Sequence, residues 1–196
     1  MIPEPCVATI GFFDGVHMGH RYLIQQVKEI AAAKGLRSAL VTFPVHPRKV
    51  MNAAYHPELL TTPEEKTNLL AGTGVDYCLM LDFTPDISRL TAKEFMTQIL
   101  KERFQVKYLV IGYDHRFGHN RSEGFDDYVR YGQAIGIEVI RAQAYTDDIQ
   151  IDTAVKEIVA VFSSIDIAIH NACLCTFANE NDTELNMYER VFNVNY

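Results

Sequence analysis

Two histidines near the start of the chain are the residues best suited to chemistry. His17 and His20 lie three apart in the segment GFFDGVHMGH, positions 11–20. This segment follows an apolar strand pattern and opens a helical one, and the free N–H groups at a helix start attract phosphate. Two imidazoles on one face of that first turn can donate hydrogen bonds to an α-phosphate and to the charge that develops on a leaving pyrophosphate. The pattern therefore favours a nucleotide site over the alternative, a tight turn with two surface histidines.

Alternating strands and helices must position these histidines. Thr62 and Thr91 are predicted helix caps, and Glu94 completes a capping box with Thr91. Hydrophobic periodicity predicts strands at 7–10, 38–43, 77–81, 108–111 and 138–140, with helices at 20–34, 62–72, 91–104 and 125–135. This order predicts an α/β fold with a doubly wound parallel sheet, Rossmann-like in organisation. Such sheets bind ligands beyond the carboxyl ends of their strands, where the strand order reverses.

Bulk composition restricts the class of protein. The 196 residues are 48% hydrophobic and carry a formal net charge of −7. This length fits one α/β domain with an appendage, and the acidity disfavours nucleic acid or an anionic membrane as a partner. No secretory signal and no apolar run of about 20 residues is found, so we expect a cytoplasmic protein whose partners are small-molecule nucleotides. The oligomeric state is not predicted. The cysteines fit neither a zinc site nor a disulfide framework; they are Cys6, Cys78, Cys173 and Cys175.

Four ordered motifs resemble one enzyme family. The HxGH pattern resembles the nucleotidylyltransferase signature, and the longer string GFFDGVHMGH is similar to the FAD synthetase module of bacterial riboflavin kinase/FAD synthetases. Three further segments resemble that family's VTFDPHPR, LTTxEEK and VVGx(D/N)FxFG; they are VTFPVHPR at 41–48, LTTPEEK at 60–66 and VIGYDHRFG at 110–118. The resemblance covers roughly residues 5–145. Pro44 and Val45 depart from the family's Asp-Pro.

The resemblance implies an adenylyl transfer in which FMN and ATP, with Mg²⁺, give FAD and pyrophosphate. It makes His17 and His20 the catalytic residues that hold the ATP phosphates, and it assigns no protein ligand to the metal. The remaining ATP-binding positions that it implies are Gly11, Phe13, Asp14, Gly15, Gly19, Asp114 and Arg116. The flavin-binding positions that it implies are His46, Pro47, Arg48 and Phe117. Two alternatives stay open: His46 as a turn cap, and Asp114 as an ordinary loop acid.

The last part of the chain, 149–196, resembles another family. FSSIDIAIHNAC at 162–173 is similar to a segment of short-chain dehydrogenases/reductases, and YERVFNVN at 188–195 is similar to the helix that carries their active-site Asn, here Asn195. Their cofactor loop, TGxxxGxG, is missing. We therefore interpret Asn171 and Asn195 as structural remnants and 149–196 as a chimeric fragment that extends the sheet. Its predicted elements are a helix at 153–162, a strand at 165–169 and a polar helical stretch at 180–194.

One phosphate motif of the FAD synthetase family, SS(T/S)xxR after the fifth strand, is not found. No serine lies between Ser122 and Ser163, and no arginine between Arg141 and Arg190. We therefore expect FMN adenylyltransferase function with reduced activity, and no riboflavin kinase activity because no kinase domain follows in these 196 residues. Two alternatives remain: a non-catalytic chimeric fold that binds nucleotide or flavin, and an NAD(P)-dependent short-chain oxidoreductase fragment. FAD formation separates the first two, and NAD(P) titration tests the third.

Overall fold

The computed structural model describes residues 4–52, 54–112, 115–119 and 122–145. The chain divides into two compact units, Met1–Gln143 and Ala144–Tyr196. The fold described below is that of the first unit. The helix, strand and polar helical stretch expected between 153 and 194 lie outside the described residues, as do Asn171 and Asn195. The chimeric interpretation of 149–196 therefore stays a prediction.

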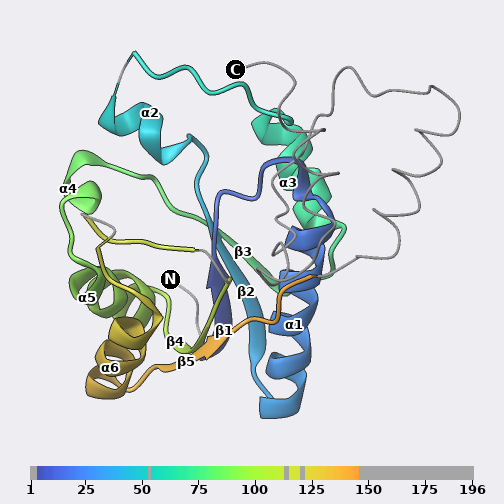
Figure 1. Cartoon of the computed structure of the whole chain (residues 1–196). Helices are drawn as coiled ribbons and strands as arrows, with labels where there is room; N and C mark the ends of the chain where they lie inside the picture. The colour runs from blue at the N-terminus through green and yellow to red at the C-terminus, as the bar shows by residue number, and fades with distance from the viewer. Residues whose placement is uncertain (1–3, 53, 113–114, 120–121, 146–196) are drawn as a thin grey trace, which may run out of the picture. The chain divides into compact units, whose positions relative to one another are not determined.

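Five strands form one sheet in the first unit (Figure 1). They are β1 (Cys6–Ile10), β2 (Arg37–Thr42), β3 (Tyr77–Met80), β4 (Val106–Ile111) and β5 (Glu138–Arg141). The order across the sheet is β3-β2-β1-β4-β5, and every neighbouring pair is parallel. The predicted parallel α/β fold is confirmed, and each predicted strand is found with ends shifted by at most two residues. The order reverses between β1 and β4, so the loops after these two strands flank the switch point.

The helical segments differ more from prediction. They are η1 (Asp14–Val16), α1 (Met18–Lys34), α2 (Pro47–Met51), α3 (Pro63–Ala71), α4 (Pro85–Ser88), α5 (Ala92–Glu94), η2 (Phe95–Arg103) and α6 (Phe125–Ile135). Thr91 and Glu94 form the expected capping box, and the expected cap Thr62 also forms one, with Glu65. The predicted helix at 91–104 is present, but its second part, η2, is π-helical. Three short turns, η1, α2 and α4, were not predicted because three to five residues give no helical period.

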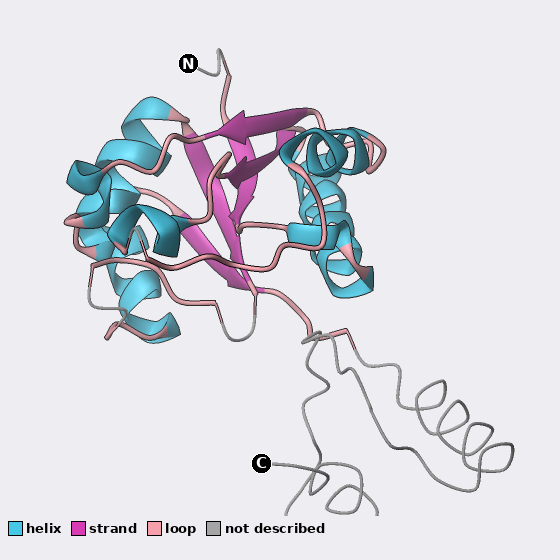
Figure 2. Cartoon of the chain, turned by 90° about the horizontal axis from the view of Figure 1, so that it is seen from above, coloured by secondary structure: helices cyan, strands magenta, loops and turns pink. Residues whose placement is uncertain are grey.

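Helices cover both faces of the sheet (Figure 2). On β1, Val7 faces the apolar side of α1 and packs with Val27 and Ala31. Ala8 and Ile10 face the other side and join the larger cluster formed with η2 and α6. Burial on both faces explains why all five residues of β1 are apolar or small and fully enclosed. No helix in the described part of the chain is long and apolar enough to cross a membrane.

Gly132 makes the closest packing contact of α6. A Cβ on Gly132 would overlap the carbonyl oxygen of Ile137, and the Gly132 carbonyl already accepts the N–H of Ile137 at 2.9 Å. We expect Gly132→Ala to lower the free energy of unfolding by about 1–3 kcal/mol, because the backbone of the α6–β5 turn must shift to admit a methyl group. Urea denaturation measures the loss. Gln133→Ala, one position along and exposed, is the control; an equal, small effect in both variants would show that this turn tolerates the shift.

Candidate functional site

The loop after β1 delivers both histidines to the start of α1. His17 is the N-cap of that helix, and its Nδ1 accepts the backbone N–H of His20 at 3.3 Å. Because Nδ1 accepts, the neutral His17 ring carries its proton on Nε2, which is then a donor. Gly19 lies between the two histidines in the first turn of α1. The helix therefore begins two residues before the predicted position, and the cap is one of the site residues themselves.

The two imidazoles form a stacked pair. Their ring centroids lie 3.5 Å apart with an interplanar angle of 19°. Burial, and then the neighbouring His17, lowers the pKa of His20 to about 3. Burial also lowers the pKa of His17, against the opposing charge of Asp14. The pair is therefore neutral at pH 7 without a ligand. Nδ1 of His20 is buried and has no hydrogen-bond partner among the described residues, which fits a site that a ligand completes.

This lowered pKa predicts a pH dependence of stability. Between about pH 6.5 and about pH 3, His20 is protonated in the unfolded chain but neutral in the folded chain. The free energy of unfolding must then fall as the pH drops through this window. We expect the pH profile of the His20→Gln variant to be flatter than that of the parent chain, measured by urea denaturation at several pH values. Parallel profiles would show that His20 is no more buried in solution than a surface histidine.

Asp14 joins the loop of residues 11–20, called the phosphate loop below because of its predicted role, to the segment before α3 through hydrogen bonds. Its carboxylate accepts the N–H of Leu60 at 2.8 Å, the N–H of Thr61 at 3.0 Å and the hydroxyl of Thr61 at 2.8 Å. Burial acts to raise the pKa of Asp14, but these hydrogen bonds together hold it below its usual value. The next residue, Gly15, has φ of 68° and donates its N–H to the Thr61 hydroxyl. The carboxylate thus positions the loop, and the predicted ATP contact of Asp14 stays a prediction.

The buried Phe13 side chain packs under the loop, against His20. Its side chain is 2% exposed, and its ring lies edge-on to His20 at 5.3 Å between centroids. A Cβ on Gly11 would lie 3.0 Å from the Phe13 ring, so glycine is the residue that fits this approach. The structure therefore brings Gly11, Phe13, Gly15, His17 and His20 into one loop, as predicted. Phe13 contributes packing, and its predicted contact with ATP stays a prediction.

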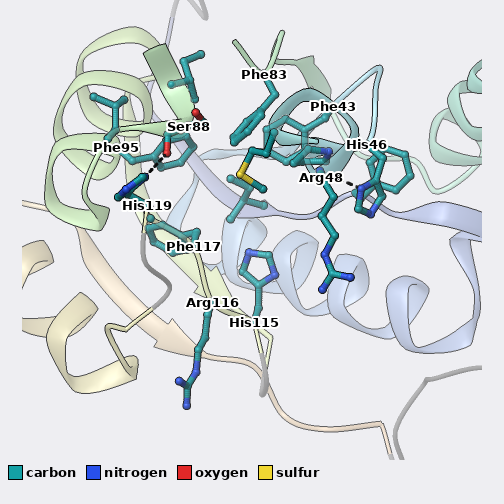
Figure 3. Close-up of a pocket in the computed structure, with 17 residues that line it drawn as sticks. Phe43, His46, Arg48, Phe83, Ser88, Phe95, His115, Arg116, Phe117 and His119 are labelled. Atoms are coloured by element: carbon teal, nitrogen blue, oxygen red, sulfur yellow. Dashed lines mark hydrogen bonds between the residues drawn. The ribbon is translucent and has the colours of Figure 1, made fainter. Parts of the chain in front are cut away.

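An aromatic pocket of about 450 Å³ lies beside this loop, beyond the strand ends (Figure 3). All four residues predicted for the flavin side contribute to its wall: His46, Pro47, Arg48 and Phe117. Phe12, from the phosphate loop, contributes as well. The remaining rings that sequence reasoning missed are Phe43, Phe83, Phe95, His115 and His119. Their positions follow separate strands and helices, and only the fold shows that they meet.

Two predicted ATP residues follow β4. Arg116 lies at the wall of the aromatic pocket, with the flavin-side set, and its side chain extends away from the phenyl rings in Figure 3. Asp114 lies outside the described residues, so both its predicted ATP contact and the alternative of an ordinary loop acid stay predictions. Because Arg116 lines the pocket with the predicted flavin-side residues, its assignment to ATP also stays a prediction.

Residues of α5 and α6 pack against the part of the pocket wall that contains Phe117 and Gly118. Tyr128 stacks on Phe117 with centroids 4.4 Å apart, and its hydroxyl accepts the Phe117 N–H at 3.1 Å. Gly118, with φ of 96°, lies so close to Ala92 that a Cβ would approach its nitrogen to 2.7 Å. A ligand would therefore meet a wall held by α5 and α6.

His46 has two roles. Its Nδ1 accepts the N–H of Arg48 at 3.2 Å and caps α2, which confirms the alternative of a turn cap. The same ring borders the pocket and lies 4.7 Å from the Phe12 ring, edge to face. Burial and the charge of Arg48 lower its pKa. His46 and Arg48 therefore place a neutral imidazole and a guanidinium in the same wall as the phenyl rings.

A family model and the sequences of known proteins both match this chain to one family. The model of the FAD synthetase family matches residues 1–153. Bifunctional riboflavin kinase/FMN adenylyltransferases are 35% identical over 144 residues in Escherichia coli K12 and 36% identical over 138 residues in Pseudomonas fluorescens. These matches cover 74% and 70% of this chain but 46% and 44% of the relatives, so the chain spans about half their length.

A solved structure is also similar. The crystal structure of a macrolide-efflux protein from Streptococcus pneumoniae has a TM-score of 0.66 and 27% sequence identity to this chain. The match covers 81% of this chain and 52% of that one. The resemblance found in the four motifs is thereby confirmed over the first three quarters of the chain. The family match also extends to residue 153, past residue 145, where the motif resemblance ended.

Proposed function

This chain belongs to the FAD synthetase family, and on that premise we propose that it transfers AMP from ATP to FMN, giving FAD and pyrophosphate. One observation supports this proposal above the others. The stacked His17–His20 pair at the start of α1 and the aromatic pocket share a loop, because Phe12 of that loop is part of the pocket wall. A phosphate site and a flavin-sized cavity thus adjoin at the switch point of the sheet.

The reaction needs positioning and charge stabilisation. An oxygen of the FMN phosphate forms a bond to the α-phosphorus of ATP, and the bond from that phosphorus to the bridging oxygen breaks as pyrophosphate leaves. No side chain has to act as a covalent nucleophile. The N–H groups of the first α1 turn and the His17 ring would donate to the phosphates. A polyanion beside the two neutral imidazoles would raise their pKa, so ATP binding would take up protons.

The pocket suits the flavin ring. Phe12, Phe43, Phe83 and Phe117 offer aromatic surface on which a planar isoalloxazine can stack, and Arg48 offers a cation for its phosphate. Figure 3 shows the Phe83, Phe95 and Phe117 rings to the left of Arg48. The wall therefore has an apolar part and a charged part, as a molecule with an aromatic ring and a phosphate requires.

The family's reaction also implies Mg²⁺. Among the residues that the structure describes, no group of three histidine, cysteine, aspartate or glutamate side chains is arranged to hold a metal ion. The Asp14 carboxylate is occupied by Leu60 and Thr61. The described residues therefore do not form a metal cage of their own, and we derive no step through the metal. The expected cytoplasmic location likewise remains a prediction.

Flavin binding tests the pocket assignment. We expect FMN fluorescence to be quenched on titration with the protein, since the flavin would stack on phenyl rings, and Phe83→Leu to weaken binding by about tenfold through loss of one ring contact. Phe125→Leu is the control. Phe125 is also a half-buried phenylalanine, but it lies on α6 and is not part of the pocket wall. Equal FMN affinity in the two variants would place the flavin elsewhere.

A further inference from the structure

One lysine of α3 is buried behind the junction of the two sites. Lys66 is 2% exposed. Its Nζ donates a hydrogen bond to the carbonyl oxygen of Phe43 at 2.7 Å and lies 3.7 Å from the centroid of the Phe12 ring. None of the ion pairs within the described ranges includes Lys66. An ammonium group is therefore held in the interior by a carbonyl and a ring face, without a carboxylate beside it.

The burial of the Lys66 ammonium group lowers the stability of the folded state. Removing an ammonium group from water costs free energy that one carbonyl and one cation–π contact only partly return. Burial accordingly lowers the pKa of Lys66, and the more distant charge of Asp14 opposes the shift. An apolar side chain of similar length would avoid this cost. The position of Lys66 therefore calls for a role outside stability.

The partners of Lys66 define that role. Phe12 and Phe43 both belong to the pocket wall, whereas Lys66 does not. Phe12 is also a residue of the phosphate loop, and its carbonyl accepts the hydroxyl of Thr42 at 3.1 Å. The Phe12 ring also contacts the His46 ring, and their centroids lie 4.7 Å apart. Lys66 thus fixes the one ring that the phosphate loop and the pocket have in common.

We propose that Lys66 is a positioning residue for the transfer reaction, which holds the Phe12 ring and the Phe43 backbone so that the flavin is presented to the nucleotide loop in one orientation. It acts through Phe12 and touches neither substrate. This inference rests on the proposed function. It assigns Lys66 to the flavin half of the reaction, because both of its contacts form the pocket wall and neither involves the histidine pair.

The test compares two lysines that make the same kind of hydrogen bond. Lys66→Met keeps the length of the side chain and removes its charge. We expect the Kd and KM for FMN to rise about tenfold, the equivalent of one desolvated cation–π contact, while the Kd for ATP stays within about twofold. Lys66→Arg, which restores a cation, should recover most of the FMN affinity. Lys28→Met is the control, since Lys28 Nζ donates to the Thr73 carbonyl at 2.8 Å and neither residue is part of the pocket wall.

A second readout needs no activity. The charged groups that act on His46 are Arg48 and Lys66, which lower its pKa, and Asp14, which raises it. Loss of the Lys66 charge should therefore raise the pKa of His46 in an NMR titration of Lys66→Met, and Lys28→Met should not change it. Should the parent chain neither bind FMN nor form FAD, the proposed function fails, and the His46 titration still decides whether Lys66 organises this wall.

Three results would overturn the inference. One is an FMN affinity in Lys66→Met equal to that in Lys28→Met. Another is an equal loss of ATP and FMN affinity, which indicates general destabilisation. The third is an unchanged His46 pKa. If Lys66→Met does not fold, Phe12→Leu removes the ring at the other end of the contact, and the same selective loss of FMN affinity is required of it.

Discussion

Replacing both His17 and His20 with alanine should reduce FAD formation by at least about 10²–10³-fold, since one lost contact to a developing charge already has this effect. The double variant loses both imidazoles, which stack at 3.5 Å, and it loses the N-cap of α1. ATP affinity should fall as well, because the ring donors and the ordered N–H groups of the first turn belong to the same phosphate site. Turnover with saturating FMN and calorimetric titration of ATP measure the two effects.

The cap and the imidazole can be separated. Loss of an N-cap alone costs about 1 kcal/mol of stability. His17→Asn keeps a side-chain acceptor for the His20 N–H and removes the ring, so it should restore stability without restoring turnover. His56→Ala is the control, because His56 belongs neither to the loop nor to the pocket wall. Unchanged ATP affinity and turnover in the double alanine variant would contradict the assignment of this loop as the phosphate site.

The second large effect concerns the missing phosphate motif. The family match ends at residue 153, and across that end the sequence reads Asp152-Thr153-Ala154-Val155-Lys156. Thr153 and Lys156 keep the spacing of Thr and Arg in the family's SSTxxR, with Ile151 and Asp152 where that motif has its two serines. These residues lie outside the described part of the chain, so the comparison is one of sequence. A carboxylate in place of a hydroxyl beside a triphosphate is unfavourable by like charge.

Restoring this motif should raise FAD formation. We expect Ile151→Ser and Asp152→Ser combined with Lys156→Arg to increase turnover by about 10²–10³-fold, because one charge-stabilising contact to the departing pyrophosphate has an effect of this size. Arginine offers two parallel donors to phosphate where lysine offers a point charge. The measurement is steady-state FAD synthesis by the two proteins, with Lys156→Arg alone to separate the contributions. Equal rates in the parent and restored chains would show that the motif contributes little here.

The fold was predictable because its signals are local. Each strand of the first unit contains a short apolar run, and the helices that begin after Thr62 and Thr91 have a glutamate three positions on that completes a capping box. The chain order of these elements then requires the parallel sheet. The π-helical geometry of η2 and the short turn α2 carry no periodic signal, so packing alone reveals them.

The site was predictable in part. The histidine pair and the four flavin-side residues stand in contiguous motifs, and the structure brings the second set into one wall. Phe83 and Phe95 were missed because a phenylalanine that packs in a core and one that borders a cavity look alike in sequence. Lys66 was missed for a related reason: on a helix it suggests a solvated surface, and only tertiary contacts show its burial.

Transfer of labelled phosphate tests the central claim most directly. The protein is mixed with FMN, Mg²⁺ and ATP that is labelled at the α-phosphate, and the flavin product is separated from nucleotides. If this chain is an FMN adenylyltransferase, the label appears in FAD in equal amount to the pyrophosphate released, and the signal is lost in the His17→Ala, His20→Ala double variant but not in His56→Ala. Absence of labelled FAD from the parent chain and from the chain with the restored motif, both folded and both able to bind ATP, would contradict the claim.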